Sequence, residues 1–307
     1  MKKLHWLLVI LSLFASSLVL AQSGNNANCQ DPSSSLLWKI QGKNSEVYLF
    51  GSLHLGLPEF YPLAKEIDQA FRSADYLVFE VDPTGMNDPA LVQTMLQQGM
   101  LGPNEQLSDR LSPAVIEELE TTMQAMGLPA QQFMRFRPWF ITITLSTLQM
   151  VNLGYQPNYG VELYLLNQKS ADTKILELET MAEQLSFLVA LDTEAYLEYT
   201  LKNMEQGKSM MQAMANAWAC ADKPLLTELL VDSMDMEGVD STELDQLKAT
   251  FLYDRNVKMA NKIQDFVQNG SGTYFVVVGA AHYLGDKSVV DVLQKKGISV
   301  QSVKLKR

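Results

Sequence analysis

A short frame that occurs near both ends of the chain constrains the fold most strongly. Each copy contains an apolar run, then Gly-x-x-His, then a second glycine two or three residues later, and the histidines are His54 and His282. Glu46–Phe50 is predicted to be a strand buried on both faces because it is apolar almost throughout, and Thr273–Val278 is predicted to be a strand because it is rich in aromatic and β-branched residues. A glycine before each histidine allows the backbone to turn sharply and approach neighbouring segments closely. The sequence therefore predicts a strand that ends in a histidine loop near each end of the chain.

The segments around the two frames share one predicted order, which is strand, histidine loop, helix, strand. The predicted helix and final strand are residues 63–71 and 76–81 in the first unit, and 289–296 and 298–305 in the second. Ser288 is predicted to cap the second helix, and Gly297 to end it. This repeated order predicts an α/β (α+β) fold in which both units share one central sheet and both histidine loops open at the same edge.

A long helical segment separates the two units. Residues 86–268 are rich in Met and Leu at helical spacing, and one predicted strand, Thr173–Leu178, interrupts them. The predicted helices are Pro89–Met100, Pro113–Met126, Trp139–Val151, Glu162–Asn167, Ala182–Met204, Met210–Ala217, Leu225–Leu230 and Thr242–Val267. We expect the methionines to fill the core, and an apolar binding cleft is the alternative.

The N-terminus has the pattern of a secretory signal peptide over residues 1–21. Lys2 and Lys3 precede the apolar stretch Trp6–Leu20, and Val19-Leu20-Ala21 fits a signal-peptidase site with a small residue at the cleavage point, after Ala21. An uncleaved membrane anchor is the alternative, but the stretch is short for a spanning helix. We expect an exported protein, in the periplasm of a Gram-negative bacterium or secreted, with no transmembrane segment after cleavage.

The exported chain is acidic, which restricts its partners. Without Lys2 and Lys3 it has 22 basic and 35 acidic side chains, a net charge of −13. This balance argues against nucleic acid or anionic lipid and favours a peptide or small-molecule ligand. Residues 22–35 are predicted to form a flexible leader, and residues 36–306 a single domain that contains the helical insertion.

The sequence contains two cysteines, Cys29 and Cys220. An even count in an exported chain favours a disulfide. Two unpaired thiols are the alternative, because sequence spacing cannot show that two residues lie close together.

The two histidines mark a candidate site for metal binding or proton transfer. Imidazole is well suited to both roles near neutral pH. Glu80, near the end of a predicted strand, is the expected carboxylate partner, and Asp82 shares its face at a spacing of two. The alternative is that both are solvated acids at a strand end.

Three further segments carry candidate residues. Glu162 opens a helix, where it either joins the site or only favours the helix dipole. Glu179 ends the middle strand, where it joins a polar cluster or caps the next helix. Arg255 and Asn256 lie in an amphipathic helix, where Arg255 binds carboxylates or forms a surface ion pair. Zincin helices, Gly-x-Ser-x-Gly elbows and phosphate loops do not occur in the sequence.

Several motifs occur in an order that resembles one known family. They are the two Gly-x-x-His units, Phe79-Glu80, Pro138-Trp139, Gly160-Val161-Glu162, Leu178-Glu179-Thr180 with Gln184, and Arg255-Asn256 with Met259. Over residues 36–306 the chain resembles the TraB/GumN family, in its bacterial secreted branch. The resemblance implies paired strand–helix units in one sheet and a divalent-metal site formed by His54, His282 and Glu80, with Arg255 as a companion.

The resemblance also implies peptide chemistry. The family includes the animal Tiki proteins, which look like metal-dependent proteases acting on a secreted ligand. Plasmid-borne relatives are linked to the shutdown of a peptide pheromone. Tiki proteins are membrane-anchored, whereas this chain has no second apolar stretch long enough to span a bilayer.

The leading hypothesis is an exported metal-dependent hydrolase of the peptidase type. The expected catalytic residues are His54, Glu80, Arg255 and His282, and the expected metal ligands are His54, Glu80 and His282. Residues expected to bind substrate or support the site are Asp82, Glu162, Glu179 and Asn256. Two histidines and a carboxylate suit Zn, Mn, Co or Fe. The alternatives are a periplasmic peptide-binding or sequestering protein without catalysis, and a metal-free ester hydrolase that uses histidine as its base.

Overall fold

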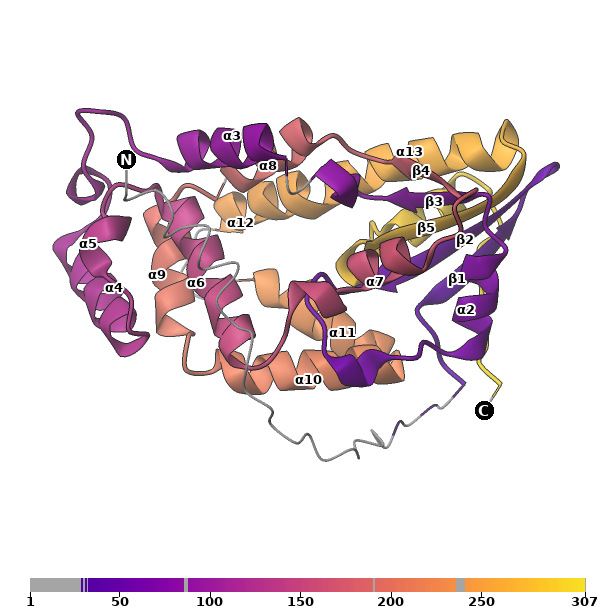
Figure 1. Cartoon of the computed structure of the whole chain (residues 1–307), viewed down its shortest axis with the longest axis horizontal. Helices are drawn as coiled ribbons and strands as arrows, with labels where there is room; N and C mark the ends of the chain where they lie inside the picture. The colour runs from indigo at the N-terminus through magenta and orange to yellow at the C-terminus, as the bar shows by residue number, and fades with distance from the viewer. Residues whose placement is uncertain are drawn as a thin grey trace.

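The computed structural model describes residues 29, 31, 33–85, 88–189, 191–235 and 241–306 (Figure 1). The predicted signal peptide lies outside the described residues, as does most of the predicted leader. Within the described part of the chain, no helix has the length and apolar composition needed to cross a membrane.

A mixed six-stranded sheet forms one part of the molecule, as the α/β prediction requires (Figure 1). Its strands lie in the order β4-β3-β5-β2-β1-β6. They are β1 (Leu37–Gln41), β2 (Ser45–Ser52), β3 (Tyr76–Phe79), β4 (Lys174–Glu177), β5 (Gly272–Gly279) and β6 (Gln301–Ser302). The four strands from β4 to β2 run parallel, and β1 is antiparallel to both β2 and β6. The central strands are almost completely buried, because helices cover both faces of a mainly parallel sheet.

The strand from the C-terminal unit lies between the two strands of the N-terminal unit. β5 pairs with β2 on one side and with β3 on the other. Ser52 is opposite Gly279, and Phe79 is opposite Val277. Both histidine loops therefore leave adjacent parallel strands at the same edge, as predicted from the repeated frame.

Two strands differ from the prediction. β1 was not predicted, because its apolar segment Leu36–Trp38 is too short to distinguish from a loop. The predicted strand at residues 298–305 was too long, since only Gln301 and Ser302 pair with β1. These two residues are exposed at the end of the sheet, so little burial favours a longer strand.

Helices make up most of the predicted insertion and flank the sheet (Figure 1). They are α2 (Lys65–Arg72), α3 (Pro89–Gly99), α4 (Pro113–Ala125), α5 (Ala130–Phe133), α6 (Pro138–Asn152), α7 (Val161–Gln168), α8 (Met181–Val189), α9 (Glu194–Lys202), α10 (Gly207–Cys220), α11 (Lys223–Leu230), α12 (Ser241–Lys248), α13 (Asp254–Gln268) and α14 (Val289–Lys295). Short 3-10 turns are η1 (Pro58–Phe60), η2 (Pro83–Gly85), η3 (Leu107–Asp109), η4 (Pro157–Tyr159), η5 (Asp232–Met234) and η7 (Ala280–Tyr283), and η6 (Ala249–Tyr253) is a π-helical turn.

Two predicted helices are interrupted. The predicted helix Ala182–Met204 is divided into α8 and α9, because the Thr193 side chain caps α9 by accepting a hydrogen bond from Tyr196 N. The predicted helix Thr242–Val267 contains η6 between α12 and α13. π-helical turns inside α-helices are frequently found at functional sites, and this one ends two residues before Arg255.

The main hydrophobic core lies around the sheet, and two smaller clusters lie among the insertion helices. Met123 and Met259 are completely buried, and Met214 nearly so. These three methionines fill the core, as expected. Ser288 accepts a hydrogen bond from Asp291 N at the start of α14, and Gly297 follows that helix with φ +80°.

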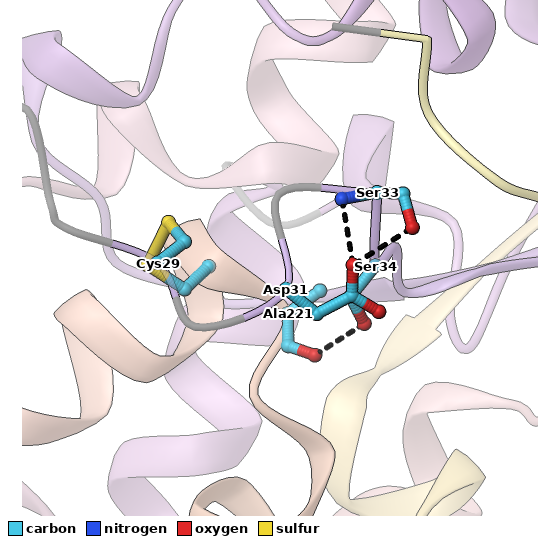
Figure 2. The surroundings of a disulfide bond; sticks show 6 residues. Cys29, Asp31, Ser33, Ser34 and Ala221 are labelled. Atoms are coloured by element: carbon cyan, nitrogen blue, oxygen red, sulfur yellow. Dashed lines mark hydrogen bonds between the residues drawn. A yellow bond between two sulfur atoms is a disulfide. The ribbon is translucent and has the colours of Figure 1, made fainter.

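A disulfide joins Cys29 to Cys220, with the two Cα atoms 5.2 Å apart (Figure 2). Near it, Ser34 Oγ donates a hydrogen bond to the Ala221 carbonyl at 2.9 Å. The N-terminal segment is therefore tied to the C-terminal end of α10 by a covalent bond and a hydrogen bond. Of the two alternatives for the cysteines, a disulfide or two unpaired thiols, the structure has the disulfide.

Removing this disulfide is expected to destabilise the fold. It closes a loop across 191 positions of sequence, and a bridge over a long loop restricts the unfolded chain strongly. We expect the Cys29→Ser/Cys220→Ser variant to lose about 2–5 kcal/mol of unfolding free energy. Urea unfolding followed by circular dichroism measures the loss, and the reduced wild-type protein is the control. Equal midpoints for the variant and the oxidised wild type would contradict this expectation.

Candidate active site

The first histidine loop is held in place by the loop that precedes α7. A Cβ on Gly160 would lie 2.1 Å from the His54 carbonyl oxygen, so glycine is needed for this close approach. Val161 N donates to the Leu53 carbonyl at 3.0 Å. Glu162 in the first turn of α7 consequently reaches His54, and its Oε1 lies 3.0 Å from His54 Nδ1. Ser52 Oγ donates a hydrogen bond to the same carboxylate oxygen.

The two partners in this contact differ in exposure. The His54 side chain is 70% exposed, whereas that of Glu162 is 15% exposed. The Glu162 carboxylate raises the pKa of His54 above its ordinary 6.5, toward about 9. Burial opposes ionisation of Glu162, but the attraction of His54 and hydrogen bonds from His54 and Ser52 lower its pKa. Water screens a pair this exposed, so its contribution to stability is small.

The Glu162→Gln variant is expected to lower the pKa of His54 toward 6.5, because the attracting charge is removed. In the wild type the folded pKa is raised, so the pair stabilises the fold fully below the unfolded pKa near 6.5, and the contribution is lost as the pH rises toward about 9. Imidazole NMR signals of the metal-free protein, recorded against pH, measure the change. If His54 titrated at the same pH in the wild type and the variant, the Glu162 charge would not be the cause of the raised pKa.

The second histidine is buried and has one defined hydrogen-bond partner. His282 lies on η7, is 5% exposed, and places its Nδ1 2.6 Å from Asn256 Oδ1. Asn256 Nδ2 donates to the Lys287 carbonyl at 2.9 Å, which orients the amide so that its oxygen faces the ring. His282 Nδ1 must then carry the proton, leaving the lone pair on Nε2. Burial lowers the pKa of His282 to about 4, so the ring is neutral at neutral pH.

Glu80 accepts three hydrogen bonds beside these rings. Its Oε1 accepts from Arg255 Nη2 at 2.5 Å and from Gln184 Nε2 at 3.2 Å, and its Oε2 accepts from Gly279 N at 2.9 Å. Burial opposes its ionisation, but the attraction of His282, His54 and Arg255 and the Gly279 hydrogen bond lower its pKa to about 2. Since a carboxylate has about four acceptor positions, about one remains free.

Arg255 links Glu80 to a second buried carboxylate. Its Nε and Nη2 donate to Glu179 at 2.8–3.1 Å, and its Nη1 donates to the Phe251 carbonyl at 3.0 Å. The Phe187 ring centre lies 5.2 Å from the guanidinium carbon. Arg255 is only 9% exposed, so the surface ion-pair alternative is wrong. Its donors are largely committed to the protein, which makes Arg255 a positioning residue for Glu80.

The three side chains converge on one point above Gly279. A Cβ placed on this glycine would lie 3.3 Å from Glu80 Oε2, 3.7 Å from His54 Nε2 and 3.8 Å from His282 Cδ2. His282 Nε2 is 3.6 Å from Glu80 Oε1. The structure thus brings together three residues that lie far apart in the sequence: His54 in the loop after β2, Glu80 directly after β3, and His282 on η7 after β5.

Asp82 lies outside this group. β3 ends at Phe79, so the alternation that would have placed Asp82 beside Glu80 no longer applies. Instead, Asp82 Oδ1 accepts hydrogen bonds from Thr84, and Asp82 N donates to Glu177. Gly51 and Gly279 have no positive φ, but the expected close approach occurs, since a Cβ on Gly51 would lie 3.3 Å from Ala280 Cα. Gly279 contributes by leaving space, as the distances to its absent Cβ show.

Two residues that contact the site carboxylates were not predicted as site residues. Ser52 binds Glu162, and Gln184 binds Glu80. Ser52 lies inside the Gly-x-x-His frame, and Gln184 lies on α8, five residues after Glu179, so position alone was a weak signal for both. Thr180, rather than Glu179, caps α8, because its Oγ1 accepts from Glu183 N.

The side chains of His54, His282 and Glu80 supply nitrogen and oxygen atoms of the kinds that bind a metal ion. In the described part of the chain, no three His, Cys, Asp or Glu side chains lie close enough to hold an ion as they stand. Two observations nevertheless fit. Each histidine Nδ1 faces an oxygen, of Glu162 or Asn256, as is typical of metal-binding histidines. The acceptor position of Glu80 that remains free is on Oε2, since Oε1 already accepts from Arg255 and Gln184, and Oε2 is the oxygen that faces the point above Gly279 where the two rings converge.

Comparison with known proteins identifies the family. The model of the TraB/PrgY/gumN family matches residues 36–302, which is most of the chain. The chain belongs to the TraB/PrgY/gumN family. Proteins similar to it include the uncharacterized protein YbaP of Escherichia coli K12, which is 25% identical over 254 residues that cover 82% of this chain and 89% of YbaP.

Similar proteins also occur in other organisms. An uncharacterized protein of Treponema pallidum is 26% identical over 85% of this chain and 80% of its own length. Metalloprotease TIKI1 of Danio rerio is 22% identical over 89% of this chain and 64% of its own length. No solved structure matches the chain. The name of TIKI1 indicates that some relatives are metal-dependent proteases.

Proposed function

We propose that this family member is an exported, metal-dependent hydrolase of peptides. The observation that supports this most directly is the matched pair of histidines, each with Nδ1 beside an oxygen and with its ring beside Glu80 above Gly279. Metal binding requires the His54 ring to lose its Nε2 proton. Nε2 of each ring is then a ligand atom, and the Glu80 carboxylate supplies a third. The name metalloprotease carried by TIKI1 supports both the metal and the peptide substrate.

His54, His282 and Glu80 would hold the divalent cation, which could be Zn, Mn, Co or Fe. When bound, such a cation polarises a carbonyl group and makes bound water more acidic. The low pKa of Glu80, about 2, suits a carboxylate ligand that stays ionised and makes it a weak proton acceptor. Asn256 fixes the His282 tautomer, and Glu162 orients the His54 ring.

Arg255 and Glu179 prepare this site without contacting the substrate. Arg255 holds Glu80 from one side while the Gly279 amide holds it from the other. These two contacts restrict the carboxylate to one orientation, which is the form of preorganisation that catalysis needs. Glu179 is 1% exposed and balances the charge of Arg255 in the interior.

Metal removal and restoration test this proposal. The chain without residues 1–21 is treated with a chelator, refilled separately with Zn, Mn, Co or Fe(II), and offered random-sequence peptide pools. We expect about one metal ion per chain and metal-dependent cleavage detected by mass spectrometry. His54→Ala should lose both, while Asp68→Asn, an exposed carboxylate on α2, is the matched control. Peptide binding without cleavage in any metal form would favour the sequestering alternative.

A further inference from the structure

The sheet has an unpaired edge at β4. Lys174 N and Leu178 N donate to the Asp75 and Phe79 carbonyls, so alternate residues of this segment face β3. The residues between them, Ile175 and Glu177, point their backbone N–H and C=O groups the other way. In the sheet formed by the described residues, no strand pairs with this side of β4.

A groove of about 480 Å³ runs beside this edge, between β4 and α13. Figure 1 shows these two elements next to each other at one side of the sheet. Leu176 and Phe266 provide apolar lining, Lys262 provides a positive charge, and Asp82 and Glu177 provide negative charges. Glu177 Oε2 accepts a hydrogen bond from Asp82 N, and Asp82 Oδ1 accepts from Thr84, but among the described residues neither carboxylate nor Lys262 forms an ion pair. The groove therefore offers charges as well as a free strand edge.

The edge leads toward the candidate active site. Glu179 lies two residues after Glu177. Its N–H donates to the Glu80 carbonyl at 2.7 Å, and its carboxylate binds Arg255. A strand added beyond β4 would lie three strand spacings, roughly 14 Å, from β5 and Gly279. About four or five extended residues can cross this distance. A peptide paired with β4 can thus place a bond several residues away above Gly279.

We propose that β4 binds one flank of the peptide substrate as an added strand. Ile175 and Glu177 supply the backbone hydrogen bonds, and the groove receives side chains of the peptide. The carboxylates of Asp82 and Glu177, which form no ion pair among the described residues, select a basic side chain at the end of the groove nearest the candidate active site. β4 has only four residues with charged ends, Lys174 and Glu177, which disfavours edge pairing with a second copy of the chain. This inference rests on the proposed function.

Amide exchange measured by NMR tests the binding mode directly. The full exported chain, with metal removed so that peptides stay intact, is mixed with one of two random-sequence peptide pools, containing either a fixed arginine or a fixed glutamate. Exchange of the Ile175 and Glu177 amides should slow with the arginine pool and change less with the glutamate pool. The Leu176 amide, which faces β3, should exchange slowly in all samples.

Matched variants test the contribution to catalysis. Ile175→Pro removes an outward N–H without removing a bond to β3, and Ile175→Val keeps it. We expect Ile175→Pro to raise KM for long peptides roughly tenfold, the effect of about 1.4 kcal/mol of lost binding, with kcat unchanged. Cleavage of dipeptides, which cannot reach β4, should not change. Glu177→Lys should reverse the preference between the two pools.

The possible results separate this inference from the proposed function. Cleavage of long peptides with no slowing at Ile175 and Glu177 overturns the strand-addition site and leaves the hydrolase. Slowed exchange without cleavage in the metal-loaded protein overturns the hydrolase and supports the edge as a peptide-binding site. Slowing that depends on protein concentration without peptide assigns the edge to a second copy of the chain. If the protein neither binds nor cleaves the peptides, both the strand-addition site and the hydrolase are overturned.

Discussion

Replacing Arg255 with methionine is expected to lower the unfolding free energy by about 3–5 kcal/mol, because two buried carboxylates lose their shared cation. Glu80 and Glu179 are 7% and 1% exposed, and Arg255 donates to both. Neither carboxylate can gain enough water to replace these hydrogen bonds. Chemical unfolding followed by circular dichroism gives the free energy, and peptide cleavage should be lost in the same variant because Glu80 is no longer held.

A triple variant separates stability from positioning. Arg255→Met combined with Glu80→Gln and Glu179→Gln removes all three charges, and replacing an entire buried ionic cluster is often close to neutral in stability. We expect the triple variant to recover most of the lost stability and to remain without cleavage activity. If Arg255→Met alone were as stable as the wild type, the buried cluster would not hold the site together.

The second large effect concerns the two histidines. We expect His54→Ala and His282→Ala each to reduce kcat/KM by roughly three orders of magnitude or more, because each is a proposed ligand of the same cation. The double variant should be hardly worse than either single one, since residues that act as a unit have strongly non-additive effects. Val257→Ala, at an exposed position of α13, is the control.

Metal content measured on the same proteins provides an independent readout. Each single variant should bind the ion far more weakly than the control variant does. Losses in activity that multiply in the double variant would show that the histidines act separately. In that event the convergence above Gly279 would not represent one site.

The sequence predicted the part of the site that depends on local pattern. An apolar run followed by Gly-x-x-His specifies a strand and a loop, and two copies specify that the loops share an edge once the strands are parallel neighbours. The contact between His282 and Asn256 could not be predicted in this way. It depends on how α13 packs beside η7, which is set by the packing of buried residues such as Met259 and Ile263.

Asp82 shows where pattern reasoning fails. The spacing of two from Glu80 has meaning only while the strand continues, and β3 ends before either residue. Propensity does not predict the end of a four-residue strand with this precision, because pairing with β4 and β5 determines it. For Glu162, the sequence indicated the residue but not its partner. The contact between Glu162 and His54 depends on the close approach of Gly160 to the His54 loop, which the sequence pattern does not show.

The insertion of β5 between β2 and β3 has a consequence for biosynthesis. A growing chain has made His54, Glu80 and all the insertion helices before β5 appears, yet β2 and β3 have no direct pairing with each other. Until Gly279 emerges, the sheet lacks its middle strand, and the Glu80 carboxylate lacks both the Gly279 amide and the His282 ring. Pairings over such long sequence separation form late in folding. A nascent or truncated chain that ends before β5 would therefore carry no assembled site, and the site would assemble only after β5 and η7 have been synthesised.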